Sequence, residues 1–116
     1  MPSDLDALRE RIRRFARERD WEKFHAPKNL ASALIVEAAE LLEHFQWMTV
    51  EQSRRLDEAA MREVEREMAD VFIYLIRLSD VLGVDLLEAA RRKVEINEQK
   101  YPADRVRGSA RKYTEY

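Results

Sequence analysis

The chain has 116 residues, of which 38% are charged and 46% hydrophobic, with a formal net charge of −2. This length predicts one domain spanning residues 1–116, and the near-balanced charge excludes a surface built for a nucleic acid polymer. The absence of cysteine excludes disulfides, thiolate metal sites and cysteine nucleophiles. No stretch has the apolar length of a membrane span or a signal peptide, so we expect no membrane partner and a cytoplasmic location.

The first half of the chain predicts helices separated by an aromatic loop. Ser3 and Asp6 form a capping-box pattern, and apolar residues then recur with a helical period, which predicts a helix from about Asp4 to Arg19. The segment 20–28 has aromatic residues, a proline and no helical period, so we interpret it as a loop. A strongly apolar helix follows from Asn29 to about Phe45. Its predicted buried stripe consists of Leu30, Leu34, Leu41 and Phe45.

The second half predicts three further helices and a tail. Thr49 with Gln52 predicts a short capped helix ending near Leu56. Asp57 begins a long helix that Gly83 ends. Another capping pattern begins a helix near Asp85 that continues until Pro102. The remaining segment, 103–116, is a basic tail without pattern that includes Arg105, Arg107, Arg111 and Lys112.

These elements predict an all-α fold of four main helices and a short connecting one, arranged as a four-helix bundle. The chain has only 2 Gly and 3 Pro, which agrees with helix throughout. A compact monomer of this size offers little depth for a large ligand pocket. We therefore expect a homo-oligomer.

Two pairs of acidic residues stand within apolar sequence. Glu37 and Glu40 lie inside the stretch 34–42, and Glu67 and Asp70 precede the apolar run 71–76. Ionised carboxylates in a core cost several kcal/mol unless they are paired, protonated or bound to a cation. Residues at i and i+3 share one helix face, so two antiparallel helices can present four carboxylates to one space. Such oxygen-rich coordination suits Mg²⁺, with Mn²⁺ as a substitute.

Other interpretations of the acids remain open. Acid pairs at this spacing are common on solvated helix faces, and the acids could form salt bridges between subunits of a non-catalytic helical oligomerisation module. A metal-binding bundle without hydrolase activity is a second alternative. A di-iron bundle is disfavoured because it needs Glu-x-x-His on two helices. His25 lies in the predicted loop, and His44 follows Glu40 by four residues rather than three.

The chain resembles the all-α NTP pyrophosphatases, within them the MazG-like group, and most closely the dCTP pyrophosphatase subgroup. The pattern Glu-x-x-Glu followed by Glu-x-x-Asp is matched by Glu37-Ala-Ala-Glu40 and Glu67-Met-Ala-Asp70. Segments of the subgroup are also matched, in the same order, by residues 19–25, 27–30, 45–47, 97–102 and 111–114.

The resemblance implies hydrolysis of a nucleoside triphosphate to a monophosphate and pyrophosphate, in nucleotide-pool sanitation. It implies dimers, or tetramers built from two dimers, and we favour the tetramer. Glu37, Glu40, Glu67 and Asp70 would hold Mg²⁺, and one of them or Glu43 would accept the proton of the attacking water.

The resemblance also implies residues that bind the substrate. The region of Trp21, His25 and Trp47 lines the base pocket in the family, whereas Asn97 and Tyr101 stand where it has phosphate contacts. On the predicted helix that begins near Asp85, Lys93 shares helical spacing with Asn97, and Tyr74 follows Asp70 by one turn as a candidate donor. Some dCTP-preferring relatives carry a polar residue where this chain has Ile12. We therefore expect dCTP or modified pyrimidine deoxynucleotides as substrates.

Overall fold

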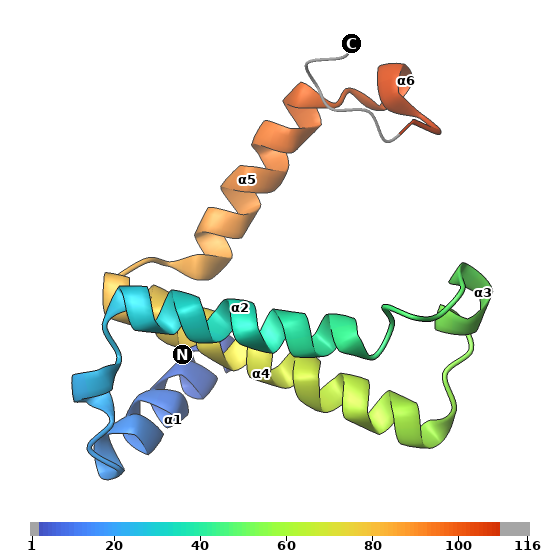
Figure 1. Ribbon diagram of the computed structural model, residues 1–116. Helices are drawn as coiled ribbons and strands as arrows, with labels where there is room; N and C mark the ends of the chain where they lie inside the picture. Colours follow the sequence, from blue (N-terminus) through green and yellow to red (C-terminus); the bar gives the residue numbers. More distant parts are fainter. Residues whose placement is uncertain (1–2, 110–116) are drawn as a thin grey trace. The chain divides into compact units, whose positions relative to one another are not determined.

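The computed structural model describes residues 3–109, and all regular structure in this range is helical (Figure 1). No strand occurs among these residues, which confirms the predicted all-α class. The elements in chain order are α1 (Asp4–Glu18), the 3₁₀ helix η1 (Glu22–Phe24), α2 (Pro27–Glu43), α3 (Val50–Ser53), α4 (Glu58–Leu82), α5 (Leu86–Lys100) and α6 (Ala103–Val106).

The chain divides between Gly83 and Val84 into two compact units. In the first unit, α2 and α4 lie side by side and run in opposite directions, with α3 in the connection between them (Figure 1). Helix α1 packs against α4. The second unit contains α5 and α6. The place of α5 in a four-helix bundle therefore stays a prediction.

Local capping explains where most of these helices begin. Ser3 and Asp6 form a reciprocal capping box on α1, and Thr49 and Gln52 form one on α3. Asp57 and Asp85 each accept a hydrogen bond from a backbone N–H in the first turn of the helix that follows. Gly83 ends α4 with φ of 71°, a left-handed conformation that glycine adopts without steric cost. The predicted caps are thus confirmed.

The structure differs from the predicted boundaries at several places. Helix α2 ends at Glu43 rather than near Phe45, and α3 ends at Ser53 rather than near Leu56. Helix α2 begins at Pro27 rather than Asn29, because a proline in the first turn loses no helical hydrogen bond. The loop before it contains η1. The tail contains α6, for which Pro102 is the N-cap, although its sequence shows no apolar period. Arg111 and Lys112 lie outside the described residues.

Few apolar side chains are buried within the described chain. Those that are buried are Ala16, Leu30, Val64 and Ile76. The other members of the predicted stripe are half-buried, Leu34 and Leu41 on α2 and Phe45 after its end. Large apolar side chains remain exposed on both central helices, including Ile35, Val36, Leu42, Met68 and Phe72. An open groove of about 620 Å³ on α2 and α4 is lined mainly by apolar residues, of which Met68 and Phe72 are exposed.

None of the described helices combines the length and the apolar character needed to cross a membrane.

A charged contact fixes α1 to α4. Arg13 of α1 donates two hydrogen bonds to Asp80 of α4, from Nε to Oδ2 at 2.9 Å and from Nη2 to Oδ1 at 2.6 Å. Arg77, which is buried one turn earlier on α4, donates from Nη1 to Asp80 Oδ2 at 3.4 Å. The hydrogen bonds from Arg13, followed by the charges of both arginines, hold the pKa of the Asp80 carboxyl below its usual value.

We predict that Asp80→Asn lowers the melting temperature at pH 7 by more than about 5 °C, because it leaves Arg77 buried without its carboxylate. A carboxyl with a depressed folded-state pKa stabilises the fold above its unfolded pKa, and this stabilisation is lost as the pH falls through the folded pKa. The difference between variant and wild type should therefore shrink below about pH 4.

Thermal unfolding followed by circular dichroism measures this difference. Glu10→Gln is the matched control, because Glu10 also binds Arg13 but at an exposed position. Equal melting temperatures for Asp80→Asn and Glu10→Gln would show that the Asp80 contact does not hold α1 in place.

Candidate functional site

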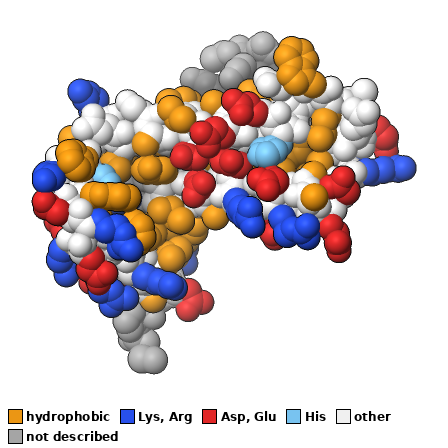
Figure 2. All heavy atoms as spheres, turned by 60° about the horizontal axis from the view of Figure 1, so that its bottom comes forward, with side chains coloured by type: hydrophobic (Ala, Val, Ile, Leu, Met, Phe, Trp, Pro, Cys, Tyr) orange, Lys and Arg blue, Asp and Glu red, His pale blue; other side chains and the backbone are white. Residues whose placement is uncertain are grey.

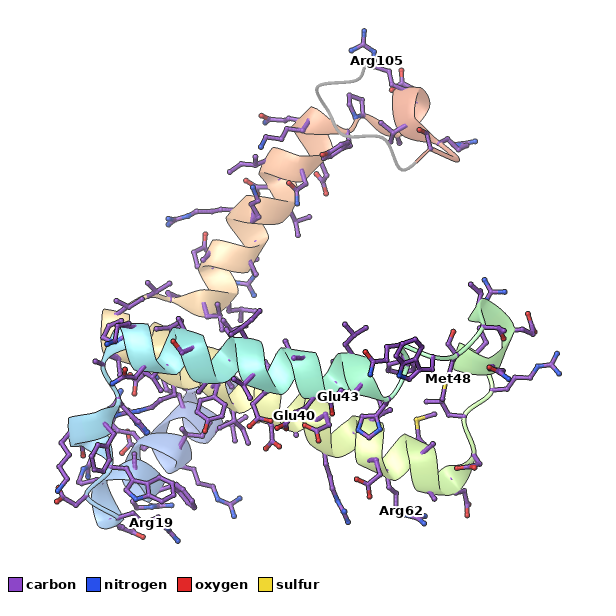
Figure 3. The ribbon with its side chains drawn as sticks, in the orientation of Figure 1. Arg19, Glu40, Glu43, Met48, Arg62 and Arg105 are labelled. Atoms are coloured by element: carbon purple, nitrogen blue, oxygen red, sulfur yellow. The ribbon has the colours of Figure 1, made fainter. Side chains whose placement is uncertain are left out.

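Carboxylates from α2 and α4 converge where the two helices face each other. One carboxylate oxygen from each of Glu37, Glu67 and Asp70 lies within 4.8 Å of the other two. Glu40 extends from α2 towards α4 (Figure 3) and interacts with Glu37 and Glu67. Acidic side chains gather in the middle of one face of the molecule (Figure 2). The antiparallel packing of α2 on α4 thus brings the two predicted acid pairs together.

The electrostatics of this acid cluster oppose full ionisation. Burial, contact with Glu40 and the charges of the other acids raise the pKa of Glu37 from 4.5 to about 7. Burial and the charge of Glu40 likewise raise the pKa of Glu67, while His44 opposes this shift. Glu37 Oε2 and Glu67 Oε2 are buried and have no hydrogen-bond partner among the described residues. Such orphaned oxygens need a compensating partner.

A hard divalent cation fits this donor set. The converging groups are all carboxylate oxygens, which magnesium and manganese prefer, and Glu37 and Glu67 each have a buried oxygen without a donor. The geometry brings three of the four predicted ligands together, with Glu40 alongside Glu37 and Glu67. The assignment of all four acids as ligands stays a prediction.

His44 is a member of this neighbourhood that the sequence reasoning missed. Its Nε2 lies 4.0 Å from Oε1 of Glu67, and its side chain is half-buried. From the sequence, His44 is considered only as a ligand of a di-iron site, for which its spacing of four residues from Glu40 is unsuitable. Its position one turn after Glu40, at the end of α2, places it on the acid face of that helix.

A second feature of the first unit is a small cavity of about 90 Å³. It lies among residues of α1, of the segment that contains η1, and of α4. Its lining includes Ile12, Phe15, Trp21, His25, Tyr74 and Arg77. Three predicted substrate-binding residues, Trp21, His25 and Tyr74, are therefore brought together, with Ile12 beside them.

The aromatic wall of the cavity is held in place by contacts around Phe15. Trp21 meets Phe15 edge to face, with ring centroids 5.7 Å apart, and the Arg19 guanidinium lies 3.7 Å from the centroid of Phe15. Trp21 nevertheless remains 45% exposed. One aromatic surface is thus positioned and still accessible to a ligand.

The cavity adjoins the acid cluster along α4. Tyr74 lines the cavity, and Asp70 of the cluster precedes it by four residues. Residues at this spacing are neighbours on a helix surface, with Cβ atoms about 5–6 Å apart. A ligand with a ring in the cavity could therefore reach the acids with an attached charged group.

The remaining candidate residues lie elsewhere. Trp47 follows α2, is 89% exposed and is not among the residues that line the cavity. Lys93 and Asn97 are exposed on α5, and Tyr101 caps the end of that helix, all in the second unit. Their roles as base or phosphate contacts stay predictions.

We predict that Glu37→Gln stabilises the metal-free protein at and above about pH 7, where the wild-type carboxylate must ionise beside other acids. An acid whose folded-state pKa is raised loses its stabilising contribution as the pH rises from its unfolded pKa, about 4.5, through its folded pKa, about 7. The variant and wild type should therefore melt alike well below pH 4.5 and diverge above it.

Melting curves recorded in a chelator across this pH range provide the measurement. Glu63→Gln, at an exposed position of α4, controls for the loss of one negative charge. A variant that melts below wild type at pH 8 would contradict the repulsion inferred for the cluster.

The chain is similar in sequence to a known protein family and to characterised pyrophosphatases. The model of the MazG-like family matches residues 33–116. The chain is 45% identical over 117 residues to dCTP pyrophosphatase 1 of Homo sapiens and 43% identical over 116 residues to that of Mus musculus. Each match covers 96% of this chain and 66% of the relative, so the chain spans about two thirds of the length of these relatives.

A solved structure extends the agreement to the fold. A pyrophosphatase from Archaeoglobus fulgidus superposes with a TM-score of 0.82 and is 44% identical in sequence. The match covers 86% of this chain and 94% of that protein. The family model, the curated relatives and the shared fold all lead to the same assignment: this chain belongs to the MazG-like family.

Proposed function

We propose that the protein is a Mg²⁺-dependent nucleoside triphosphate pyrophosphohydrolase, which converts a deoxynucleoside triphosphate and water to the monophosphate and pyrophosphate. The observation that carries this proposal is the convergence of Glu37, Glu67 and Asp70, with two buried carboxylate oxygens that lack donors. The pyrophosphatase names of its relatives support the same reaction. The proposed role is the removal of unwanted nucleotides from the free nucleotide pool. The proposed location is the cytoplasm.

The acids of α2 and α4 have two proposed roles, binding the cation and accepting a proton. Glu37, Glu67 and Asp70, with Glu40 beside them, would hold the cation. A bound Mg²⁺ would supply two effects, a lower pKa of the attacking water and neutralisation of charge on the phosphates. One carboxylate of the cluster or the nearby Glu43 accepts a proton from the water that attacks the α-phosphorus. Pyrophosphate then leaves with the electrons of the broken phosphorus–oxygen bond.

The size of the cavity favours a substrate with a pyrimidine base. Such substrates include dCTP and modified pyrimidine deoxynucleotides. Its volume of about 90 Å³ is smaller than the roughly 150 Å³ of an apolar cavity known to admit benzene. A single ring with one edge outside fits this space better than a fused two-ring base. Trp21 offers an aromatic face, and such stacking is tolerant of base identity.

We also propose that the chain works as a homo-oligomer, with a tetramer favoured over a dimer. Apolar side chains of α4, including Met68 and Phe72, line the open groove against α2 and are about half exposed. Continuous apolar surfaces of this kind mark protein interfaces. A second copy is the occupant we propose, because the four apolar residues buried within residues 3–109 form a small core for this range.

The reaction is tested by incubating canonical and modified nucleoside triphosphates with the protein and Mg²⁺, and resolving the products by phosphorus NMR. We predict a monophosphate and intact pyrophosphate, with deoxypyrimidine substrates preferred. Glu67→Gln and Asp70→Asn should each lower kcat by at least about a hundredfold, because each removes a ligand charge from the cluster.

Glu63→Gln is the control on the same helix and should keep wild-type activity. Orthophosphate as the first product would contradict the proposed reaction. Full activity of both cluster variants would contradict the proposed metal site. If the wild-type protein forms an oligomer but hydrolyses no triphosphate, the alternative of a non-catalytic oligomerisation module is favoured.

The assembly is tested by light scattering at micromolar concentration, for which we predict a mass of at least two chains. Phe72→Glu should shift this mass towards the monomer, because it places a charge in the apolar groove. Arg62→Glu, at an exposed position of α4 outside the groove, should leave the mass unchanged. A wild-type protein that is monomeric and active would refute the proposed assembly.

A further inference from the structure

Arg77 is a buried cation that the proposed reaction does not use. Its side chain is 8% exposed, and it lines the cavity rather than the acid cluster. A buried guanidinium is costly unless it is paired and hydrogen-bonded. Arg77 meets this requirement with two partners, Asp80 through Nη1 and His25 through Nε.

The contact with His25 decides where the histidine proton lies. Arg77 Nε lies 3.0 Å from His25 Nδ1, and an arginine nitrogen can only donate a hydrogen bond. Nδ1 must therefore carry the lone pair, so the proton of the neutral ring is on Nε2. No described residue accepts a hydrogen bond from this Nε2, and the ring lines the cavity.

Burial and the charge of Arg77 favour the neutral form of the His25 ring. Burial lowers its pKa first, and the charge of Arg77 from α4 lowers it further, while Glu22 of η1 opposes them. Protonation of Nδ1 would also set two donors, Arg77 Nε–H and the imidazolium N–H, against each other.

Asp80 and Arg13 keep Arg77 in this position. Asp80 accepts from Arg77 Nη1 while its two oxygens also bind Arg13 from α1. The guanidinium of Arg77 is thus directed by a carboxylate that is itself fixed between two helices. Removing Arg77 leaves Asp80 paired with Arg13, so the contact of α1 with α4 does not depend on Arg77 alone.

We propose that Arg77 is a positioning residue that holds His25 as an Nε2–H donor, so that the cavity selects a ring presenting a hydrogen-bond acceptor to it. A carbonyl oxygen or an unprotonated ring nitrogen of a pyrimidine meets this requirement. The identification of the ring as a nucleobase rests on the proposed function; the tautomer of His25 does not.

The direct test is nitrogen-15 NMR of the histidine side chains in the metal-free and ligand-free protein. The chain has two histidines, and His44→Gln identifies the signals of His25. We expect the Nε2–H tautomer for His25 in wild type and in the control Arg62→Met, which removes an exposed arginine from the same helix. Arg77→Met should give a mixture of both tautomers and a higher His25 pKa, because the donor and its charge are gone.

Steady-state kinetics with a pyrimidine deoxynucleoside triphosphate test the consequence for binding. Arg77→Met should raise KM by about tenfold with kcat within about twofold, because a misplaced donor weakens base binding and leaves the acid cluster intact. Arg62→Met should match wild type. Arg77→Gln, whose amide can donate to Nδ1, should recover part of the lost affinity.

A proton on Nδ1 of His25 in wild type, or an unchanged tautomer in Arg77→Met, would overturn the positioning role. The expected tautomers with an unchanged KM would overturn the selection of an acceptor. If wild type hydrolyses no triphosphate, the proposed function fails, and the NMR result still decides the role of Arg77.

Discussion

The packing of α2 against α4 forces like charges together, and the site depends on this constraint. Each helix carries acids on the face that it must bury against the other, so Glu37, Glu67 and Asp70 converge. The apolar contacts of the pair, such as buried Leu30, Val64 and Ile76, hold the carboxylates close although their repulsion opposes it. The raised pKa values of Glu37 and Glu67 express this conflict, which a cation between the helices would resolve.

A separate charged contact places the cavity beside these acids. Arg13 and Asp80 fix α1 to α4, and the aromatic residues of α1 and of the following segment then enclose a space next to Tyr74. Because Tyr74 is one turn from Asp70, the proposed substrate would be able to place its base in the cavity and its phosphates at the acids. A single helix, α4, thus contributes residues to both the cavity and the acid cluster.

Sequence reasoning found the features that have a local cause. The caps at Ser3, Thr49 and Asp57 follow from short-range hydrogen bonds, and the acid pairs stand out because charge interrupts an apolar run. Arg77 and Asp80 interrupt the apolar end of α4 in the same way, so the same argument could have identified them. The pairing of Arg13 with Asp80 spans 67 residues, and no periodicity indicates such a contact. The helix α6 has no apolar stripe that could have predicted it.

Our central proposal is that the acids of α2 and α4 form a divalent cation site. The family membership and the convergence of these acids both support it. A crystal structure of the protein soaked with Mn²⁺, with anomalous diffraction recorded near the manganese edge, tests this claim most directly. We expect an anomalous peak within coordination distance of the Glu37, Glu67 and Asp70 carboxylates, and its loss in Glu67→Gln. A peak bound only by other residues, or none at these acids under conditions that support hydrolysis, would contradict the account.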